Sequence, residues 1–418
     1  MSRTLTSTVL ALALALAACT TAEDRRGDGG GDKGGVATGP GVTGDTISLG
    51  ALVDLTAVFA PNSKSILQGS RLYWEERNSE GGVCGRDVEL EVEDHGYDPQ
   101  QAVSLYRQMS SEVLALSPVL GSPVITALLP SFEQDDMTVG MAAWTSAVLP
   151  NDNIQITGAT YDLEMINGID YLMREEGLQR GDTVGHIYFE GDFGENALEG
   201  TQFAAEKYDL DVVEQRIVPT DTDLSTQVNE LRRRGAKAIL LSVGSPQTAS
   251  VASVAAASGL DVPIIGNGPI FTPQLLGTPA AEALEANVLT VSSVAPPSLQ
   301  QSSVDEFLTE FEQAHPDAEP TQNGSMYGYA SGQIMGAALE RACENGDLTR
   351  AGVREALHSL SNYDSGGSVA GPLDYSNPAE APTRMVYVSR VNGDVPGGLE
   401  AVGDPFVSPV AEEYGFGG

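Results

Sequence analysis

Apolar and polar residues follow two different periods along the chain, and these periods predict strands and helices in turn. Residues 47–53 form a short apolar run, as in a strand that is buried on both faces. Ile66, Gly69 and Leu72 then fall on one helical face. In residues 88–92, valine or leucine alternates with glutamate, which is the period of a half-buried strand. Such a strand–helix–strand unit requires a right-handed crossover between parallel strands.

The same alternation continues to the C-terminal part of the chain. Further strands are predicted at 116–120, 137–141, 183–189, 238–243, 264–266 and 385–391, and further helices at 100–113, 124–132, 163–176, 224–234, 244–257, 304–314, 327–343 and 350–360. This order predicts an α/β fold with parallel-rich sheets. A body of about 370 residues is too large for one core, so two domains are expected.

The strand ends indicate where a ligand would bind. The loop at residues 54–62 follows the first strand, and open α/β sheets bind ligands at the carboxyl ends of their strands. Gly121-Ser122-Pro123 opens a helix after another strand, with serine as a favoured N-cap and proline in the first turn. The free N–H groups of such a helix attract anions. A plain helix cap explains the same residues equally well.

The N-terminal segment has the features of an export signal. In residues 1–18, one arginine precedes the apolar run Val9–Ala18, which is shorter than the roughly 20 residues that span a bilayer. Residues 16–19 resemble a bacterial lipobox, in which Cys19 would be lipidated and become N-terminal, although an ordinary signal with an unrelated cysteine is the alternative. Residues 19–44 are rich in glycine without apolar periodicity and are predicted to be a flexible tether. An exported protein, lipid-anchored to the outer face of the membrane, is expected.

Charge and missing motifs exclude several classes of protein. The chain has 58 acidic and 22 basic residues, a net charge of −36, and loss of Arg3 with the signal gives −36 − 1 = −37. No basic patch for nucleic acid is visible, and the acidity favours solubility. The sequence contains no G-x-S-x-G, H-E-x-x-H or Walker motif, and its four histidines are scattered. We therefore expect no enzyme activity, no cofactor, no metal and no nucleic-acid partner.

Several motifs occur in an order that resembles the type I periplasmic binding proteins, most closely their leucine/isoleucine/valine-binding (amino-acid) branch of ABC transporter solute receptors. The motifs are Asp54-Leu55-Thr56, Asn78 with Gly81-Gly82, Gly85-Arg86, and Asp94 with Asp98-Pro99. This family usually has glycine at the position of Ala57. The resemblance extends loosely over residues 47–390.

The resemblance implies two Rossmann-like lobes joined by three hinge crossings, with a small polar ligand, such as an amino acid or a related compound, in the cleft. The lobes would comprise residues 45–158 with 293–364, and 159–292 with 365–418. A monomer would close on its ligand and deliver it to a membrane permease driven by ATPase subunits. Two other classes stay open: a ligand-sensing subunit for a membrane kinase or chemoreceptor, and an enzyme of unknown type.

The resemblance also implies the roles of several residues. Ser122 matches the serine that holds the ligand carboxylate, Ala143 and Thr145 would offer a carbonyl and a hydroxyl, and Phe193 would cover the ligand from the second lobe. Trp144 is unusual in its loop and either lines the cleft or packs elsewhere. The remaining candidates for ligand contact are Thr56, Phe59, Tyr161, Asp192, Ser245, Asn267 and Gly268.

The cysteines suggest one disulfide. If Cys19 carries lipid, Cys84 and Cys343 remain in an oxidising compartment, where pairing is expected. The resemblance places both in the same lobe, which favours a Cys84–Cys343 bond over two separate thiols.

The expected ligand depends on a missing acid. A buried ammonium needs a carboxylate or several acceptors, and the resembling receptors supply an acid where this chain has Asn267-Gly268-Pro269. Asp162, Asp192 or Glu195 could substitute, and Asp192 is the best placed. If none does, an amide, a urea-like compound or a small carboxylate beside Trp144 and Phe193 would fit better.

Overall fold

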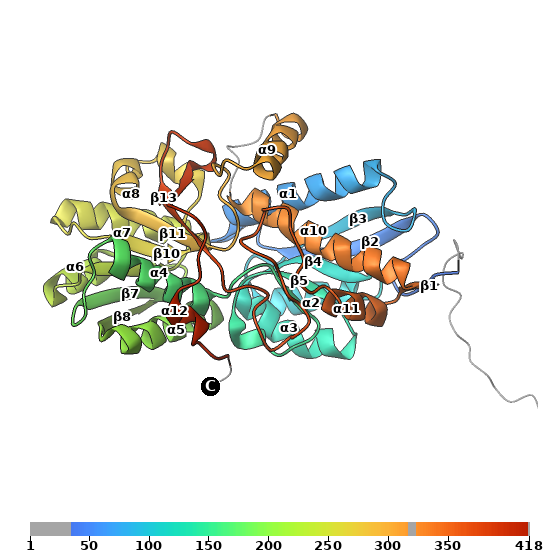
Figure 1. Cartoon of the computed structure of the whole chain (residues 1–418), viewed down its shortest axis with the longest axis horizontal. Coiled ribbons are helices and arrows are strands. Elements are labelled where there is room, and N and C mark those ends of the chain that lie inside the picture. Colours follow the sequence, from blue (N-terminus) through green and yellow to red (C-terminus); the bar gives the residue numbers. More distant parts are fainter. Residues whose placement is uncertain (1–34, 317–322, 417–418) are drawn as a thin grey trace, which may run out of the picture.

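The computed structural model describes residues 35–316 and 323–416. Two lobes lie side by side, each built around its own sheet (Figure 1). The predicted signal peptide, Cys19 and the first part of the predicted tether lie outside the described residues.

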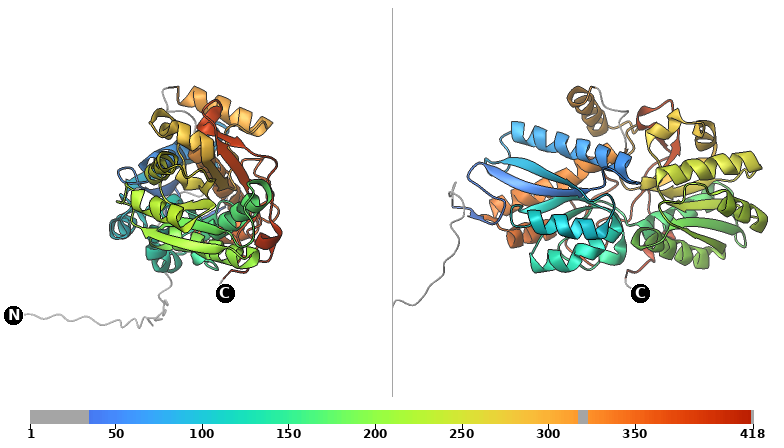
Figure 2. Two further views of the ribbon diagram at one scale, coloured as in Figure 1. Left: turned by 90° about the vertical axis from the view of Figure 1, so that its left-hand side faces the viewer. Right: turned by 180° about the vertical axis from the view of Figure 1, so that it is seen from behind.

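The first lobe contains a five-stranded, fully parallel sheet. Its strand order is β3 (Asp87–Asp94), β2 (Thr46–Val53), β4 (Ala115–Leu120), β5 (Val139–Ala142), β6 (Ile154–Ile156). Helices α1 (Ala60–Ser79) and α10 (Asn323–Glu344) cover one face, and α2 (Pro99–Met109) and α3 (Ser122–Gln134) cover the other (Figures 1 and 2). Burial on both faces explains why β4 is apolar without alternation.

Two glycines let α1 and α10 approach closely. A Cβ added at Gly69 would lie 1.8 Å from the carbonyl oxygen of Ser325, and one at Gly328 would lie 1.9 Å from that of Ile66. Any larger residue at either position would force the helices apart. The close packing brings the first turns of both helices to the same edge of the sheet.

The second lobe contains a seven-stranded mixed sheet. Its order is β14 (Leu399–Ala401), β13 (Tyr387–Val391), β11 (Val288–Ser292), β10 (Ile264–Asn267), β9 (Ala238–Ser242), β7 (Thr183–Phe189), β8 (Asp211–Ile217), with only the pairings of β13 antiparallel. Its helices are α4 (Tyr161–Glu175), α5 (Asp192–Tyr208), α6 (Ser225–Arg234), α7 (Ser245–Ser258), α8 (Ala281–Asn287) and α12 (Pro409–Glu412), with short 3-10 turns η2 (Gly268–Ile270), η3 (Pro273–Gly277) and η4 (Pro396–Gly398). Helix α5 and strand β8 were not predicted from the sequence.

The chain passes between the two sheets three times, after β6, after β11 and before β13. The domain boundaries remain a prediction. The third passage, for which a boundary at residue 365 was predicted, lies later in the chain. Leu373 and Tyr375 pack with Ala330 and Ile334 of α10, and the Tyr375 hydroxyl donates to the Ile156 carbonyl at 2.8 Å. A division after Tyr375 fits these contacts better.

The last part of the predicted tether is ordered, so the prediction of a flexible segment up to residue 44 is wrong from residue 37. Strand β1 (Ala37–Thr38) pairs in parallel with β12 (Asp347–Leu348). Val42 is only 7% exposed and packs in the same apolar cluster as Leu348. The few apolar residues of this segment lie among many glycines, so the sequence pattern did not predict an ordered segment. Their burial against the first lobe holds the segment in place.

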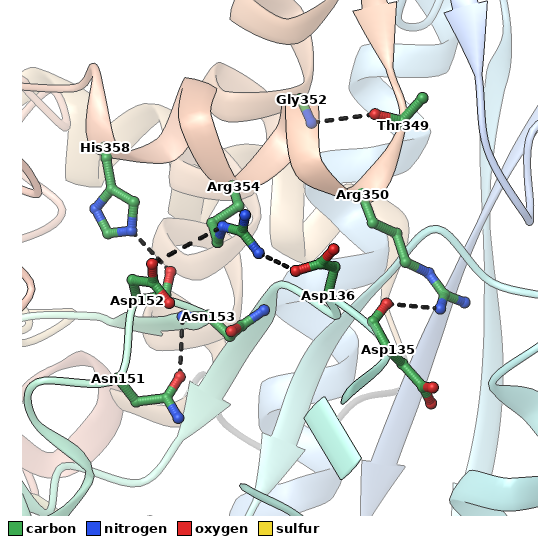
Figure 3. Close-up of polar contacts among 10 residues, drawn as sticks. All are labelled: Asp135, Asp136, Asn151, Asp152, Asn153, Thr349, Arg350, Gly352, Arg354 and His358. Atoms are coloured by element: carbon green, nitrogen blue, oxygen red, sulfur yellow. Dashed lines mark hydrogen bonds and ion pairs between the residues drawn. The ribbon is translucent and has the colours of Figure 1, made fainter. Parts of the chain in front are cut away.

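Helix α11 (Arg350–His358) ties the outer side of the first lobe together (Figure 3). The Arg350 guanidinium donates to the carbonyl oxygens of Asp135 at 3.0 Å, Val113 at 2.9 Å, and Ser110. Asp135 and Ser110 cap the C-terminal ends of α3 and α2. A positive charge at these ends stabilises both helix dipoles.

One disulfide joins Cys84, in the loop after α1, to Cys343 near the end of α10, with a Cα–Cα distance of 5.9 Å. The expected pairing is therefore present in the structure. The remaining helix, α9 (Ser302–Ala314), lies beside α1 (Figure 1).

Candidate functional site

A cavity lies between the lobes, at the carboxyl edges of both sheets. From the first lobe it is lined by Phe59, Asn62, Ile66, Tyr97, Leu120, Gly121, Ser122, Ala142, Trp144, Asn323, Gly324 and Tyr327. From the second lobe it is lined by Tyr161, Phe193, Gly268, Pro269, Phe271, Ser292 and Val294. Its free space is about 60 Å³. This is the place where open α/β sheets bind ligands.

Six rings form a continuous aromatic chain through this cavity. The successive centroid distances are Tyr97–Phe59 4.9 Å, Phe59–Phe193 6.3 Å, Phe193–Tyr161 4.5 Å, Tyr161–Trp144 5.8 Å and Trp144–Tyr327 4.6 Å. These distances are typical of favourable edge-to-face and tilted ring pairs. Because Phe193 and Tyr161 belong to the second lobe, the chain of rings joins the lobes in a closed arrangement.

A buried aspartate shapes the loop that carries Phe59. Asp54 is fully buried, and its carboxylate accepts hydrogen bonds from the backbone N–H groups of Ala57 at 2.6 Å and Phe59 at 2.8 Å. It also accepts one from the N–H of Thr56, whose side chain is exposed and does not line the cavity. The carboxylate of Asp54 therefore holds the loop and presents Phe59 to the cavity.

Ser122 lies where β4 turns into α3. Gly121 has φ 102° and is the N-cap, so the expectation that Ser122 caps the helix is wrong: it is the first helical residue and its side chain makes no capping bond. A Cβ at Gly121 would lie 2.8 Å from the Tyr97 ring, which leaves room only for glycine. Ser122 is 1% exposed, and its Oγ has no hydrogen-bond partner of ordinary geometry among the described residues. The hydroxyl lies beside that of Tyr161 and, as a donor with two acceptor lone pairs, has capacity for a bond to a ligand.

Only Trp144 of the loop after β5 reaches the cavity. Its indole Nε1 donates to the Thr157 carbonyl at 2.9 Å. The Ala143 side chain is buried in the core of the first lobe, and the Thr145 hydroxyl accepts from the Ala147 N–H at 3.2 Å at the start of η1 (Ser146–Val148). The Thr145 hydroxyl thus stabilises a turn and does not line the cavity.

Asn267 lies behind the cavity wall. Its side chain is fully buried, donates to Glu164 Oε2 at 2.9 Å and to the Tyr161 carbonyl at 3.2 Å, and accepts from the Ser242 hydroxyl at 2.6 Å. Burial raises the pKa of Glu164 well above its usual range. With every polar atom of its amide engaged, Asn267 supports the wall, and only the next residue, Gly268, lines the cavity.

Three residues form a polar latch between the lobes: Ser146, Asp162 and Asn196. Ser146 of the first lobe donates to Asp162 Oδ2 at 2.5 Å and accepts from Asn196 Nδ2 at 2.7 Å. The Ser146 N–H donates to Asn196 Oδ1 at 3.1 Å. Asp162 is fully buried, which raises the pKa of its carboxyl. The Asp162 carboxylate is therefore occupied by the latch and does not line the cavity.

The other polar candidates also lie outside the cavity. Asp192 is the half-buried first residue of α5, and Ser245 is the buried first residue of α7. Exposed Glu195 lies 3.5 Å from Arg216. Burial, with smaller contributions from Asp54 and Asp192, raises the pKa of the Tyr97 hydroxyl. Among the residues that the structure describes, no charged side chain lines the cavity.

Several lining residues were missed. Tyr97 and Phe271 follow strands β3 and β10, so the rule that placed Phe59 would have found them. Asn323 and Tyr327 come from the first turns of α10, and no local signal marks them. Asn62 lies in the first turn of α1.

Five helices begin at this cavity: α1, α3, α4, α5 and α10. They contribute Phe59, Ser122, Tyr161, Phe193 and Asn323 to its lining, each within one position of a helix start. Helix N-termini carry partial positive charge and unpaired N–H groups. Together with the uncharged side chains, they give a cavity whose field favours an anion.

Two lobes that close on such a cavity are the architecture of an extracytoplasmic solute receptor. The family model for periplasmic binding proteins matches residues 46–396. The chain belongs to this family, as a type I periplasmic binding protein of the leucine/isoleucine/valine-binding branch. Membership of this family implies an exported protein.

Similar proteins share this fold, and the ligands given in their names differ. A fatty acid ABC transporter substrate-binding protein from Thermomonospora curvata is 42% identical, with a TM-score of 0.90 over 93% of this chain and 98% of its own. A branched-chain amino acid ABC transporter protein from Thermus thermophilus with bound valine is 17% identical, with a TM-score of 0.78 over 90% of this chain and 99% of its own. Leu/Ile/Val-binding protein homolog 3 of Brucella melitensis is 21% identical over 350 residues, 79% of this chain and 87% of its own.

Two features are absent from residues 35–316 and 323–416. No helix there is long and apolar enough to cross a membrane. No group of three or more His, Cys, Asp or Glu side chains there is arranged to hold a metal ion.

Proposed function

We propose that this protein is the substrate-binding lipoprotein of an ABC importer and that its ligand is a carboxylate with an apolar body, of the fatty-acid kind. It would capture the ligand in the cavity between the lobes and deliver it to a permease driven by ATPase subunits. It binds its ligand without changing it, and it is anchored by lipid at Cys19.

The observation that carries this proposal is the chemistry of the cavity lining. Ser122 offers a buried hydroxyl, without a hydrogen bond of ordinary geometry, at the start of α3, where N–H groups and the helix dipole favour an anion. The remaining wall is dominated by the aromatic chain, which favours an apolar body.

An α-amino acid fits this lining less well. Its ammonium would lose hydration and needs a carboxylate or several acceptors in return. Asp162 is occupied in the latch, and neither Asp192 nor Glu195 lines the cavity. An amino acid is the second candidate, because Asp192 is only one residue from Phe193 and the fold is shared with receptors named for leucine, isoleucine and valine.

The relative from Thermomonospora curvata supports the first candidate. Its name specifies a fatty acid, and at 42% identity over nearly the whole chain it is far more similar to this protein than the amino-acid receptors described above. The name describes that protein, and the uncharged lining gives an independent reason to expect the same class of ligand here.

Ligand would act by stabilising the closed form. The rings of Phe59 and Phe193 come from different lobes and contact the same cavity, so a ligand between them gains affinity only when the lobes close. The closed form would be the one that the permease accepts. A sensing role would use the same closure, and a permease and an ATPase encoded beside this chain would favour transport.

Calorimetry with matched compounds tests the ligand. Hexanoate, leucine, the deaminated acid of leucine (4-methylpentanoate) and the amide of that acid are titrated into the full chain. We expect the two carboxylates to bind and leucine to bind more weakly than its deaminated acid. Leucine binding more tightly than 4-methylpentanoate would overturn the carboxylate proposal. The anchor is tested separately, since Cys19→Ala should move the protein from membranes to the soluble fraction.

A further inference from the structure

We infer that Tyr161 is a specificity-determining residue of the cavity, whose hydroxyl donates a second hydrogen bond to the ligand carboxylate beside the one from Ser122. This inference rests on the proposed function. The two residues reach the cavity from different lobes, since Ser122 begins α3 of the first lobe and Tyr161 begins α4 of the second. A carboxylate has two oxygens with about four lone-pair sites, so it can accept from both hydroxyls at once.

Neighbouring groups hold the Tyr161 side chain in place at this position. The residue is only 4% exposed, and its ring centroid lies 4.5 Å from that of Phe193 and 5.8 Å from that of Trp144. Its backbone N–H donates to the Trp144 carbonyl at 2.7 Å. The Tyr161 hydroxyl lies beside that of Ser122. Both hydroxyls therefore lie near the start of α3, where the free N–H groups favour an anion.

The Tyr161 hydroxyl keeps its proton and can therefore donate it in a hydrogen bond. Burial raises the pKa of this hydroxyl well above its usual range. Glu164 lies near it, but burial raises the pKa of the Glu164 carboxyl as well, which favours its neutral form. A carboxylate beside Tyr161 therefore meets hydrogen-bond donors and little opposing charge.

Two other described tyrosines line the cavity, and their surroundings differ. The Tyr327 hydroxyl donates to a backbone carbonyl of β5 and is already engaged. Burial raises the pKa of the Tyr97 hydroxyl, and the charges of Asp54 and Asp192 raise it further. The same two charges would repel a carboxylate beside Tyr97. Tyr161 is therefore the tyrosine whose surroundings suit the charged end of the ligand.

Tyr161→Phe tests the inference, because it removes the hydroxyl and keeps the ring. Dissociation constants of the full chain are measured by calorimetry for 4-methylpentanoate and for its amide. A hydrogen bond to a charged acceptor is stronger than one to a neutral acceptor. The variant should therefore bind the carboxylate about ten- to hundredfold more weakly, and the amide should lose less affinity.

Tyr375→Phe is the matched control. It also removes a buried phenol hydroxyl, which donates to the Ile156 carbonyl at 2.8 Å, but Tyr375 does not line the cavity. This variant should lower the melting temperature of the ligand-free protein and leave both dissociation constants unchanged. If the amide binds too weakly to be measured, a loss of carboxylate affinity in Tyr161→Phe that Tyr375→Phe does not share supports the inference.

The outcomes separate the inference from the proposed function. Equal losses for the carboxylate and the amide would show that the Tyr161 hydroxyl supports only the closure of the lobes. An unaltered constant for the carboxylate would show that the hydroxyl does not contact the ligand. Either result overturns the inference while the function stands. If neither hexanoate nor 4-methylpentanoate binds the unsubstituted chain, the proposed function fails, and the inference fails with it.

Discussion

Ser146 and Asp162 join the two lobes through a 2.5 Å hydrogen bond from the serine hydroxyl to a fully buried carboxylate. We expect this bond in the closed arrangement alone, because Ser146 and Asp162 lie on opposite sides of the first passage between the sheets. A hydrogen bond to a charged group contributes about 1.5–3 kcal/mol. Ser146→Ala should therefore weaken ligand binding about ten- to hundredfold, because the closed form loses that contribution. Calorimetry with the best-bound carboxylate measures the change.

Thr160→Ala is the matched control for the latch. Thr160 also donates its hydroxyl to Asp162, but it lies only two residues before it in the chain, so that bond does not span the lobes. This variant should lower the melting temperature without a comparable loss of affinity. Equal losses of affinity in both variants would show that the Ser146 bond has no special role in closure.

Ser122→Ala should weaken carboxylate binding about ten- to hundredfold and leave the fold intact, because the lost hydrogen bond is made to a charged group. The chain provides a matched control in Gly244-Ser245-Pro246, a second Gly-Ser-Pro helix start whose serine is buried outside the cavity. Ser245→Ala should leave the dissociation constant unchanged. An unaltered constant in Ser122→Ala would remove Ser122 from the site.

The disulfide between Cys84 and Cys343 closes a loop with a sequence separation of 259. In the chain-entropy model, such a loop stabilises the native state by about 5 kcal/mol. Replacing both cysteines by alanine should lower the urea midpoint accordingly, with little effect on ligand affinity because neither residue lines the cavity. Thiol labelling of the unfolded, unreduced exported protein should find neither cysteine free. Two labelled thiols would refute the bond in solution.

Glu76 should make stability fall with rising pH. Burial, reinforced by a hydrogen bond with the neighbouring Glu310 carboxyl, raises the pKa of Glu76 to about 8 from 4.5. Between these values the folded state holds a proton that the unfolded state releases, so the free energy of unfolding decreases as pH rises, by up to about 1.4 kcal/mol per pH unit. Glu76→Gln should remove this dependence, since the amide can still accept the 2.7 Å hydrogen bond from Tyr329.

Urea unfolding of both chains from pH 5 to pH 9 checks this prediction. Burial lowers the pKa of His186 to about 3, which acts in the opposite direction below about pH 6.5, but it acts equally in both chains. The difference between them therefore isolates Glu76. A constant difference across the range would mean that Glu76 is ionised in the folded protein.

The buried strands could be predicted from sequence because parallel strands covered on both faces are continuous apolar runs. The predicted strand 183–189 matches β7 in both bounds. Strand β8 was missed because it lies at the edge of its sheet and alternates irregularly between buried and exposed residues. Helix α5 was missed because its first residues, Asp192-Phe193-Gly194-Glu195, were interpreted as a loop.

Several aromatic residues of the site could be predicted from the sequence, whereas much of its polar lining could not. Phe59, Trp144 and Phe193 follow strand ends, and all three line the cavity. Asn267 also lies at the end of a strand, but its amide donates to Glu164 and does not line the cavity. This orientation depends on the packing of α4 against β10, which the sequence does not show. Tyr327 reaches the cavity because two glycines let α10 approach α1, a relationship between distant segments.

If lipid at Cys19 anchors the receptor, as proposed, strand β1 limits how far it can reach from the membrane. It pairs with β12 at the end of the first lobe that points away from the second lobe (Figure 1). Residues 19–36 would then separate Cys19 from β1, and a chain of that length spans at most about 60 Å. Since β1 attaches to the first lobe alone, the second lobe could then swing without pulling on the proposed anchor. With such an anchor, ligand capture and lateral search along the membrane would be mechanically independent.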